Sequence, residues 1–146
     1  MMIKVVPAQE EHIESIVEIE NKCFSVPWSH GSFLRELYSD DGYIPTAFDG
    51  EKIVGFAIFH RIGEEGEIFN IAVSPEYRGQ GVGSRILEAV IRNAMLNMVK
   101  KVFLEVRPSN EPAIALYKKY GFKQVGRRKN YYIKPVEDAI IMEREV

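Results

Sequence analysis

Cysteine and histidine are scarce in this chain of 146 residues, which contains 1 Cys and 3 His. A single cysteine, Cys23, cannot form an internal disulfide, and we expect it to be a small buried thiol rather than a catalytic group. The histidines, His12, His30 and His60, are scattered and lack the spacing of metal ligands. The sequence therefore predicts neither a disulfide framework nor a metal site.

The chain also has no long apolar run and no excess of basic charge. None of its apolar stretches approaches the about 20 residues that a membrane-spanning helix needs, and the N-terminal stretch ends at Pro7, too early for a signal peptide. Its 19 basic and 21 acidic side chains give a net charge of -2, whereas duplex-DNA binders usually carry a large basic excess. We therefore expect a cytoplasmic protein without membrane or direct nucleic-acid partners.

The length and the 46% apolar content favour a single domain over residues 1–146. Strand-like and helix-like patterns alternate, which is typical of an α/β or α+β layer structure. The predicted strands cover residues 3–6, 43–48, 53–59, 67–73, 102–106, 122–126 and 139–142. The predicted helices cover residues 9–20, a stretch capped by Ser29, residues 83–97 and a stretch capped by Asn110. Asp49-Gly50 predicts a hairpin, and the continuous apolar run 67–73 predicts the centre of the sheet.

The most informative segment joins the predicted central strand to the next helix and reads Arg78-Gly79-Gln80-Gly81-Val82-Gly83-Ser84. Glycines permit a tight turn and close approach to a ligand, and a helix start offers free N–H groups to a phosphate or pyrophosphate. Because residue 84 is Ser, the dinucleotide pattern G-x-G-x-x-G fails, and the chain has no ATPase-type phosphate-binding loop. On the glycines alone, a tight loop without a ligand stays open.

The run Arg78-Gly79-Gln80-Gly81-Val82-Gly83 resembles the R/Q-x-x-G-x-G/A acetyl-CoA motif of the Gcn5-related N-acetyltransferase (GNAT) family. The resemblance covers nearly the whole chain and is also carried by residues 69–73, 104–107, 109–110, 113–117, 121–122, 128–132 and 137–142. More narrowly, these runs resemble the branch that acetylates the N-terminal alanine of ribosomal proteins. The resemblance implies a mixed, mostly antiparallel sheet of about seven strands flanked by about four helices.

The same resemblance implies that acetyl-CoA is the co-substrate and indicates which residues would hold it. In the family, backbone amides of the glycine turn hold the coenzyme pyrophosphate, which here indicates Gly79, Gln80, Gly81, Val82, Gly83 and Ser84, beside Arg78. Backbone groups of the preceding strand, here Ile71, Ala72 and Val73, would pair with the pantetheine arm and the thioester. Asn110 matches a family position that contacts coenzyme A.

Acetyl transfer to an amine requires a base for the amine and an acid for the leaving thiolate. Glu105 is the only acid in the predicted strand 102–106 and matches the family's proton acceptor. Tyr117, on the predicted helix after Asn110, matches the family's proton donor. Without the resemblance, a solvent-facing strand glutamate and a core tyrosine are the alternative interpretations.

The acceptor is expected to be a protein N-terminus, because an α-amine has a pKa of about 7.7–8.0 and a lysine amine one of about 10.4. By resemblance, Pro27 and Trp28 in one loop and Tyr131 and Tyr132, expected between the last two strands, flank the acceptor peptide. Simple coverage of the core by these aromatics is the alternative. Three other functions stay open: acetylation of a lysine or small amine, a non-catalytic coenzyme A-binding module, and an RNA-binding domain.

Overall fold

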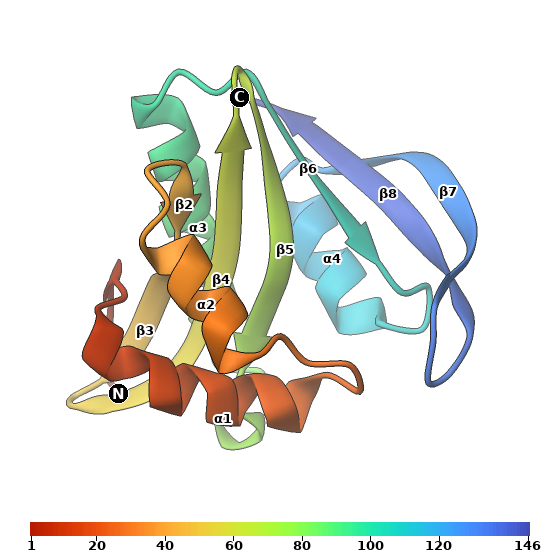
Figure 1. Ribbon diagram of the computed structural model, residues 1–146. Coiled ribbons are helices and arrows are strands. Elements are labelled where there is room, and N and C mark those ends of the chain that lie inside the picture. The colour runs from red at the N-terminus through yellow and green to blue at the C-terminus, as the bar shows by residue number, and fades with distance from the viewer.

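The computed structural model describes residues 1–146 as one mixed sheet with helices on both faces (Figure 1). The strands are β1 (Ile3–Pro7), β2 (Gly42–Tyr43), β3 (Pro45–Asp49), β4 (Lys52–Ile62), β5 (Glu65–Val73), β6 (Lys101–Val106), β7 (Lys123–Tyr132) and β8 (Glu137–Glu145). The helices are α1 (Ile13–Cys23), α2 (His30–Leu37), α3 (Val82–Leu96) and α4 (Glu111–Lys119), with 3-10 turns at Glu10–His12 and Pro75–Tyr77. This order confirms the predicted mixed α/β class and its four helices.

The strand order is β1-β3-β4-β5-β6-β8-β7, and β2 pairs with β4. Only β5 and β6 run parallel; every other neighbouring pair is antiparallel. The predicted hairpin is confirmed, since Asp49 pairs with Lys52 and Gly50 takes a positive φ of 63° in the turn. The predicted central position of the 67–73 run is also confirmed, because β5 has three strands on either side of it along this order.

Several element boundaries differ from the prediction. The expected strand 43–48 is split into β2 and β3, with Pro45 as the first residue of β3. Because proline has no N–H to donate, it is favoured at the start of a strand rather than inside one. The split raises the strand count to eight. The predicted first helix begins as a 3-10 turn and becomes α-helical only at Ile13, and β7 extends to Tyr132, well beyond its expected end.

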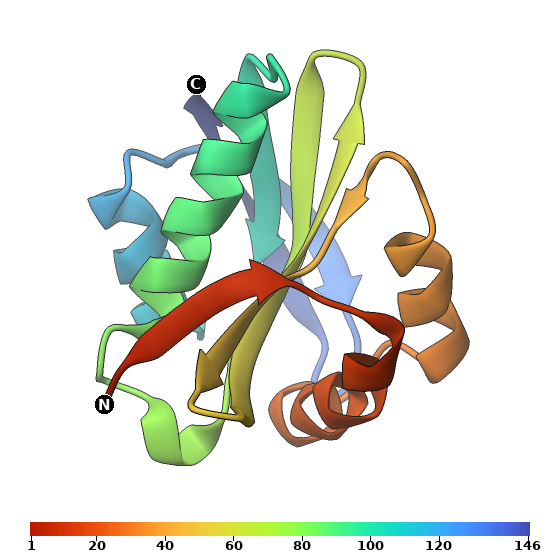
Figure 2. The same cartoon turned by 90° about the vertical axis from the view of Figure 1, so that its left-hand side faces the viewer.

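The helices cover the two faces of the sheet in pairs, as the turned view shows (Figure 2). Under α3 and α4 lies a core whose fully buried members include Ile86, Leu87, Val90, Val102 and Leu104. Under α1 and α2 lies a second core that includes Ile13, Ile16, Phe33, Phe56 and Ile58. Burial of these apolar side chains, at about 25 cal/mol per Å², favours the layered arrangement and fixes the sheet between the helix pairs.

Candidate active site

The two central strands separate partway along their length (Figure 1). Pairing of β5 with β6 involves only β5 residues 65–68. Immediately after it, the register of β4 against β5 shifts, so that Phe69 is an extra residue between the paired positions Ile68 and Asn70. A bulge of this kind bends a strand and increases its twist. The second half of β5 therefore pairs only with β4 and presents a free backbone edge on its other side.

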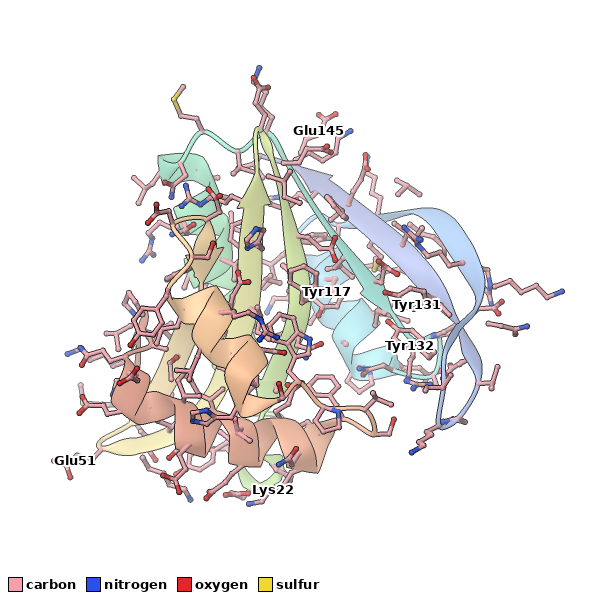
Figure 3. The ribbon with its side chains drawn as sticks, in the orientation of Figure 1. Lys22, Glu51, Tyr117, Tyr131, Tyr132 and Glu145 are labelled. Carbon is pink, nitrogen blue, oxygen red and sulfur yellow. The ribbon has the colours of Figure 1, made fainter.

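A cavity of about 770 Å³ opens where these strands separate. Its lining comes from β5, β6, α4, the loop between α1 and α2, and the segment at the end of β7. The predicted site residues in this lining are Trp28, Ile71, Glu105, Asn110, Tyr117, Tyr131 and Tyr132. Tyr117, Tyr131 and Tyr132 are labelled close to β6 in Figure 3. The fold thus brings residues from distant parts of the sequence to one opening.

The glycine turn lies between the free edge of β5 and the start of α3. Gly79 and Gly81 have φ values of 74° and 83°, in the left-handed region that L side chains rarely adopt. Gly81 is the N-cap of α3, and no side chain caps the first N–H groups of that helix. Uncapped N–H groups and the helix dipole make this end of α3 suited to an anion such as a pyrophosphate.

The third glycine of the turn has a different role. At Gly83 an added Cβ would lie 3.2 Å from Leu116 Cδ2, so the absence of a side chain lets α3 approach α4 closely. Val82 is buried in the core and anchors the first turn of α3 from inside. The motif therefore combines two residues that set the backbone path with two that pack the helix against its neighbours.

The carbonyl oxygen of Val73, at the end of β5, is the acceptor for two groups. Arg78 Nε lies 3.3 Å from it, and Cys23 Sγ lies 3.6 Å from it. The Arg78 side chain also donates to Cys23 Sγ at 3.4 Å. Cys23 is half-buried and lines the cavity, so the expectation of a buried thiol is wrong. Cys23 is the last residue of α1 and lies at the start of the loop that lines the same cavity.

Asn110 lies at the N-terminus of α4 and lines the same cavity. Its Oδ1 accepts a hydrogen bond from the backbone N–H of Ala113 at 3.3 Å, which confirms the predicted cap. A coenzyme contact of Asn110 stays a prediction.

Glu105 reaches the cavity from β6, where inward and outward side chains alternate. Its Oε2 atom is buried without a hydrogen-bond partner, and the nearest cation, Arg128 Nε, is 3.5 Å away. Glu67 on β5 also lines the cavity; burial raises the pKa of its carboxyl group, and the negative charge of Glu105 adds to the rise. The cavity thus contains a carboxylate with one oxygen that accepts no hydrogen bond and has Arg128 as its ion-pair neighbour.

Tyr117 reaches the cavity from α4 and is almost completely buried, with a relative exposure of 5%. Its ring packs on Phe122 with 5.7 Å between centroids. Burial raises the pKa of the Tyr117 phenol well above its usual value, and the neighbouring Tyr132 adds to the rise. The phenol therefore keeps its proton at neutral pH and has one to donate.

Tyr131 and Tyr132 form an edge-to-face pair with 5.0 Å between ring centroids. They belong to the end of β7 and do not lie between the last two strands, so that part of the prediction is wrong. The register of β7 against β8 shifts between Arg128 and Tyr132, and Asn130 has a positive φ of 52°. Both rings lie beside this irregularity and line the cavity.

Trp28 lines the cavity from the loop between α1 and α2. Its ring packs between Phe33 and Phe69, each with 5.5 Å between centroids. Pro27, its neighbour, is exposed and is not part of the cavity lining. The structure therefore brings Trp28, but not Pro27, to the other predicted residues.

Sequence reasoning missed three charged residues of this region. Glu67 and Arg107 line the cavity, and Glu20 lies fully buried behind it. Glu20 left a detectable signal, because it shares the helical stripe of Ile13 and Ile16, where an acid is unexpected. Arg107 directly follows the strand that contains Glu105, but its partners at the end of β7 could not be inferred from spacing.

A second groove, of about 860 Å³, lies away from these residues against α1 and the turn between β3 and β4. It is lined mainly by charged side chains of both signs, including Lys22 and Glu51, which Figure 3 labels far from Tyr117. No group of three or more His, Cys, Asp or Glu side chains is arranged to hold a metal ion. None of the helices is both long and apolar enough to traverse a lipid bilayer.

Comparison with known proteins gives consistent matches to acetyltransferases. Residues 13–122 match the model of the acetyltransferase (GNAT) family. The chain is 39% identical over 132 residues to the [ribosomal protein bS18]-alanine N-acetyltransferase of Haemophilus influenzae, covering 88% of this chain and 89% of that protein. It superposes on the crystal structure of the ribosomal-protein-S18-alanine N-acetyltransferase from Escherichia coli with a TM-score of 0.91, 33% identity and coverage of 99% and 94% of the two chains. The fold also matches a Thermoplasma acidophilum N-acetyltransferase in complex with coenzyme A, with 19% identity, a TM-score of 0.83 and coverage of 100% of each chain.

Proposed function

The chain belongs to the acetyltransferase (GNAT) family, and from that premise we propose that it transfers acetyl from acetyl-CoA directly to the N-terminal α-amine of a protein. One observation carries the proposal. A carboxylate with an oxygen that accepts no hydrogen bond, a buried phenol and a strand edge without a neighbouring strand meet in one cavity, and the strand leads to an uncapped helix N-terminus. This arrangement meets the needs of acyl transfer between a thioester and an amine.

The residues present fit acetyl-CoA. The uncapped N–H groups of Val82, Gly83 and Ser84 and the guanidinium of Arg78 would hold the pyrophosphate. The edge of β5 at Ile71, Ala72 and Val73 has no strand beside it and would pair with the amide groups of the pantetheine arm, although the Val73 carbonyl already contacts Arg78 and Cys23. When bound, acetyl-CoA supplies the activated acetyl group.

Glu105 would remove the proton from the acceptor amine, which makes its lone pair available for attack on the acetyl carbonyl. Tyr117 would donate its phenolic proton to the sulfur as the bond to the acetyl group breaks, so that the leaving group departs as a thiol. The nitrogen would lose its second proton to solvent as the amide forms, Glu105 would release its proton to solvent, and Tyr117 would regain one from solvent. An ammonium and a thioester thus become an amide and a thiol, and one proton is released in total.

The acceptor most strongly supported is the N-terminal alanine of a small-subunit ribosomal protein. The relatives named above act, by their names, on the alanine of ribosomal protein bS18. An α-amine with a pKa of about 7.7–8.0 also needs less deprotonation than a lysine with a pKa of about 10.4, at about 1.4 kcal/mol per pKa unit. A single carboxylate base is adequate for the smaller free energy needed to deprotonate an α-amine.

The test is a matched set of peptides incubated with acetyl-CoA and analysed by mass spectrometry. Each peptide begins with alanine and contains one internal lysine, and its control is the same peptide with a blocked N-terminus. We expect one acetyl group on the free N-terminus and none on the blocked peptide. Acetylation of the lysine in the blocked peptide, with none at the free N-terminus, would overturn the proposal.

A further inference from the structure

Glu20 is completely buried near the end of α1, although it is a potential charge in the middle of a core. Its Oε2 atom accepts a hydrogen bond from the backbone N–H of Trp28 at 2.9 Å and another from the side-chain amide of Asn70 at 2.8 Å. A single oxygen atom therefore connects α1, the loop between α1 and α2, and the bulged part of β5.

Both partners of Glu20 belong to the wall of the cavity, whereas Glu20 itself does not. Trp28 and Asn70 line the cavity, and Phe69, the residue of the bulge, packs against the Trp28 ring. The Glu20 carboxylate thus connects the loop that contains Trp28 to β5 at Asn70, on the side of these residues that faces away from the cavity. Its contacts determine where the indole ring lies relative to β5.

This arrangement is energetically costly, which argues for a specific role. Glu20 Oε1 is buried without a hydrogen-bond partner, and an unsatisfied polar atom of this kind costs about 1–3 kcal/mol. Burial raises the pKa of the Glu20 carboxyl group, and the hydrogen bonds from Trp28 and Asn70 oppose that rise. An apolar residue would avoid this cost but could not accept either hydrogen bond.

We propose that Glu20 is a positioning residue that fixes the Trp28 wall of the acceptor cavity through the two hydrogen bonds accepted by Oε2. Its kinetic consequence rests on the proposed function, whereas its structural consequence does not. The essential property is the acceptor atom at that position and not the negative charge. A glutamine can place an oxygen at the same point, but an aspartate is one methylene too short to reach it.

The first test uses tryptophan fluorescence, because Trp28 is the only tryptophan of the chain. We expect Glu20→Ala and Glu20→Asp to shift the Trp28 emission to the red and to raise its acrylamide quenching constant at least twofold. Glu20→Gln is expected to retain the wild-type spectrum. Asn70→Ala, which leaves Glu20 and Trp28 in place, should give an intermediate change and replaces Glu20→Ala if that variant does not fold.

The second test is steady-state kinetics with an alanine-initiated peptide. We expect Glu20→Ala and Glu20→Asp to raise the KM for the peptide about tenfold while the KM for acetyl-CoA changes less than twofold. Glu20→Gln should restore the peptide KM to within twofold. The matched control is Glu36→Ala, which removes another buried glutamate, one that contacts His60 at 2.7 Å and does not line the cavity. This control should destabilise the fold without affecting either KM.

The outcomes separate the two proposals. If Glu20→Asp behaves like the wild type and Glu20→Gln does not, the charge is the essential property and the inference is wrong. If Glu20→Ala leaves both the fluorescence and the peptide KM unchanged, the inference is also wrong. If the fluorescence changes as expected but the protein acetylates no N-terminal peptide, the positioning role stands and the proposed function fails.

Discussion

The proposed coenzyme end of the site presents mainly backbone groups, whereas the proposed acceptor end presents side chains. At the coenzyme end, the free edge of β5 and the uncapped first turn of α3 present N–H and C=O groups. At the acceptor end, Glu105 and Trp28 contact residues far along the chain, Arg128 and Phe69, while Tyr117 packs on the nearby Phe122. The two ends therefore respond to substitution in different ways.

The difference arises from what each end has to bind. A pyrophosphate and a chain of amides can be bound by backbone groups, provided that the chain takes the correct path. Proton transfer needs side chains with particular acidities at particular positions. Substitutions at the acceptor end should therefore change kcat or the KM for the peptide. Substitutions at the coenzyme end should change the KM for acetyl-CoA only if they move the backbone.

The largest effect is expected from replacing Glu105 and Tyr117, the two proposed proton-transfer residues. We expect Glu105→Gln and Tyr117→Phe each to lower kcat by about 10²-fold or more, the usual contribution of general acid–base catalysis. Because acetyl-CoA is proposed to be bound by backbone groups of β5 and α3 and not by these side chains, its KM should change less than twofold. Release of free thiol, followed spectroscopically, measures both parameters.

Tyr120→Phe is the matched control for the phenol, since Tyr120 follows α4 and does not line the cavity. It should leave kcat unaltered. If Tyr117→Phe and Glu105→Gln retained wild-type turnover, these two side chains would not be the proton carriers. Activity at the acceptor end would then depend on the placement of the backbone, as at the coenzyme end, and not on the acidity of particular side chains.

The next test disturbs the backbone at the coenzyme end. Gly81 has a φ of 83° at the N-cap of α3, and a left-handed conformation costs an alanine about 1–2 kcal/mol. We expect Gly81→Ala to move the first N–H groups of α3 and to raise the KM for acetyl-CoA about tenfold. The KM for the peptide should change less than twofold.

Gly50→Ala provides a control with similar strain, because Gly50 has a φ of 63° in the turn between β3 and β4. It should lower the melting temperature to a similar extent as Gly81→Ala but leave both KM values unchanged. The comparison between the two ends breaks down if Gly81→Ala impairs peptide and coenzyme binding equally.

The same division explains what could be predicted from the sequence. The elements of the proposed coenzyme end follow from local sequence, because the glycine turn, the strand before it and the helix after it are contiguous. That they bind a coenzyme follows only from the family resemblance and stays a prediction. Glu105 and Tyr117 were identified by family resemblance, and their position in one cavity agrees with it. Their catalytic roles stay predictions.

The sequence could not predict the contacts that hold the acceptor end. Glu20 and Asn70 are 50 residues apart, and Ser109 and Glu137 are 28 residues apart, so no local pattern connects either pair. The register shift of β7 at Asn130 was also not predicted; there the Asn130 backbone N–H donates a hydrogen bond to Asp138 Oδ1 on the neighbouring strand. Long-range side-chain contacts of this kind emerge only from the folded chain.

Arg107 offers a smaller perturbation of the acceptor end. Its guanidinium donates to the carbonyl oxygens of Ile133 and Pro135 at 2.9 Å each and lies 4.4 Å from the centre of the Tyr132 ring. A lysine cannot reproduce this planar, forked contact. We expect Arg107→Lys to raise the KM for the peptide about threefold to fivefold, with little change in the KM for acetyl-CoA.

The control for this prediction is Arg127→Lys, on the β7–β8 hairpin that Arg107 contacts but outside the cavity lining. Arg127 is about half exposed and contacts Asp138 at 2.7 Å, and exposed ion pairs contribute about 0–1 kcal/mol. Its replacement should leave the peptide KM unchanged. An equal effect of both substitutions would mean that general loosening of the hairpin, and not the Arg107 contact, determines peptide binding.

The smallest expected effect is a loss of local stability at low pH, which we expect at the acceptor end and not at the coenzyme end. Burial would raise the pKa of Glu137, but the N–H and hydroxyl groups of Ser109 together with Arg107 outweigh it and lower that pKa. The Asn130 N–H and Arg127 lower the pKa of Asp138. Both carboxylates therefore stabilise the folded state above their unfolded pKa values of about 4, and this stabilisation is lost as the pH falls through their lower folded values.

Hydrogen exchange at pH 7 and pH 3 can localise that loss. We expect amides of β7 and β8 near the cavity to lose protection in acid earlier than amides of α3, whose start has no comparable carboxylate partner. The double variant Glu137→Gln, Asp138→Asn should be less protected than the wild type at pH 7 and nearly equal to it at pH 3, because the ionised forms that it lacks contribute only at the higher pH. Equal loss of protection in α3 would show that acid destabilises the whole fold. The contacts of Glu137 and Asp138 would then give the acceptor end no pH dependence of its own.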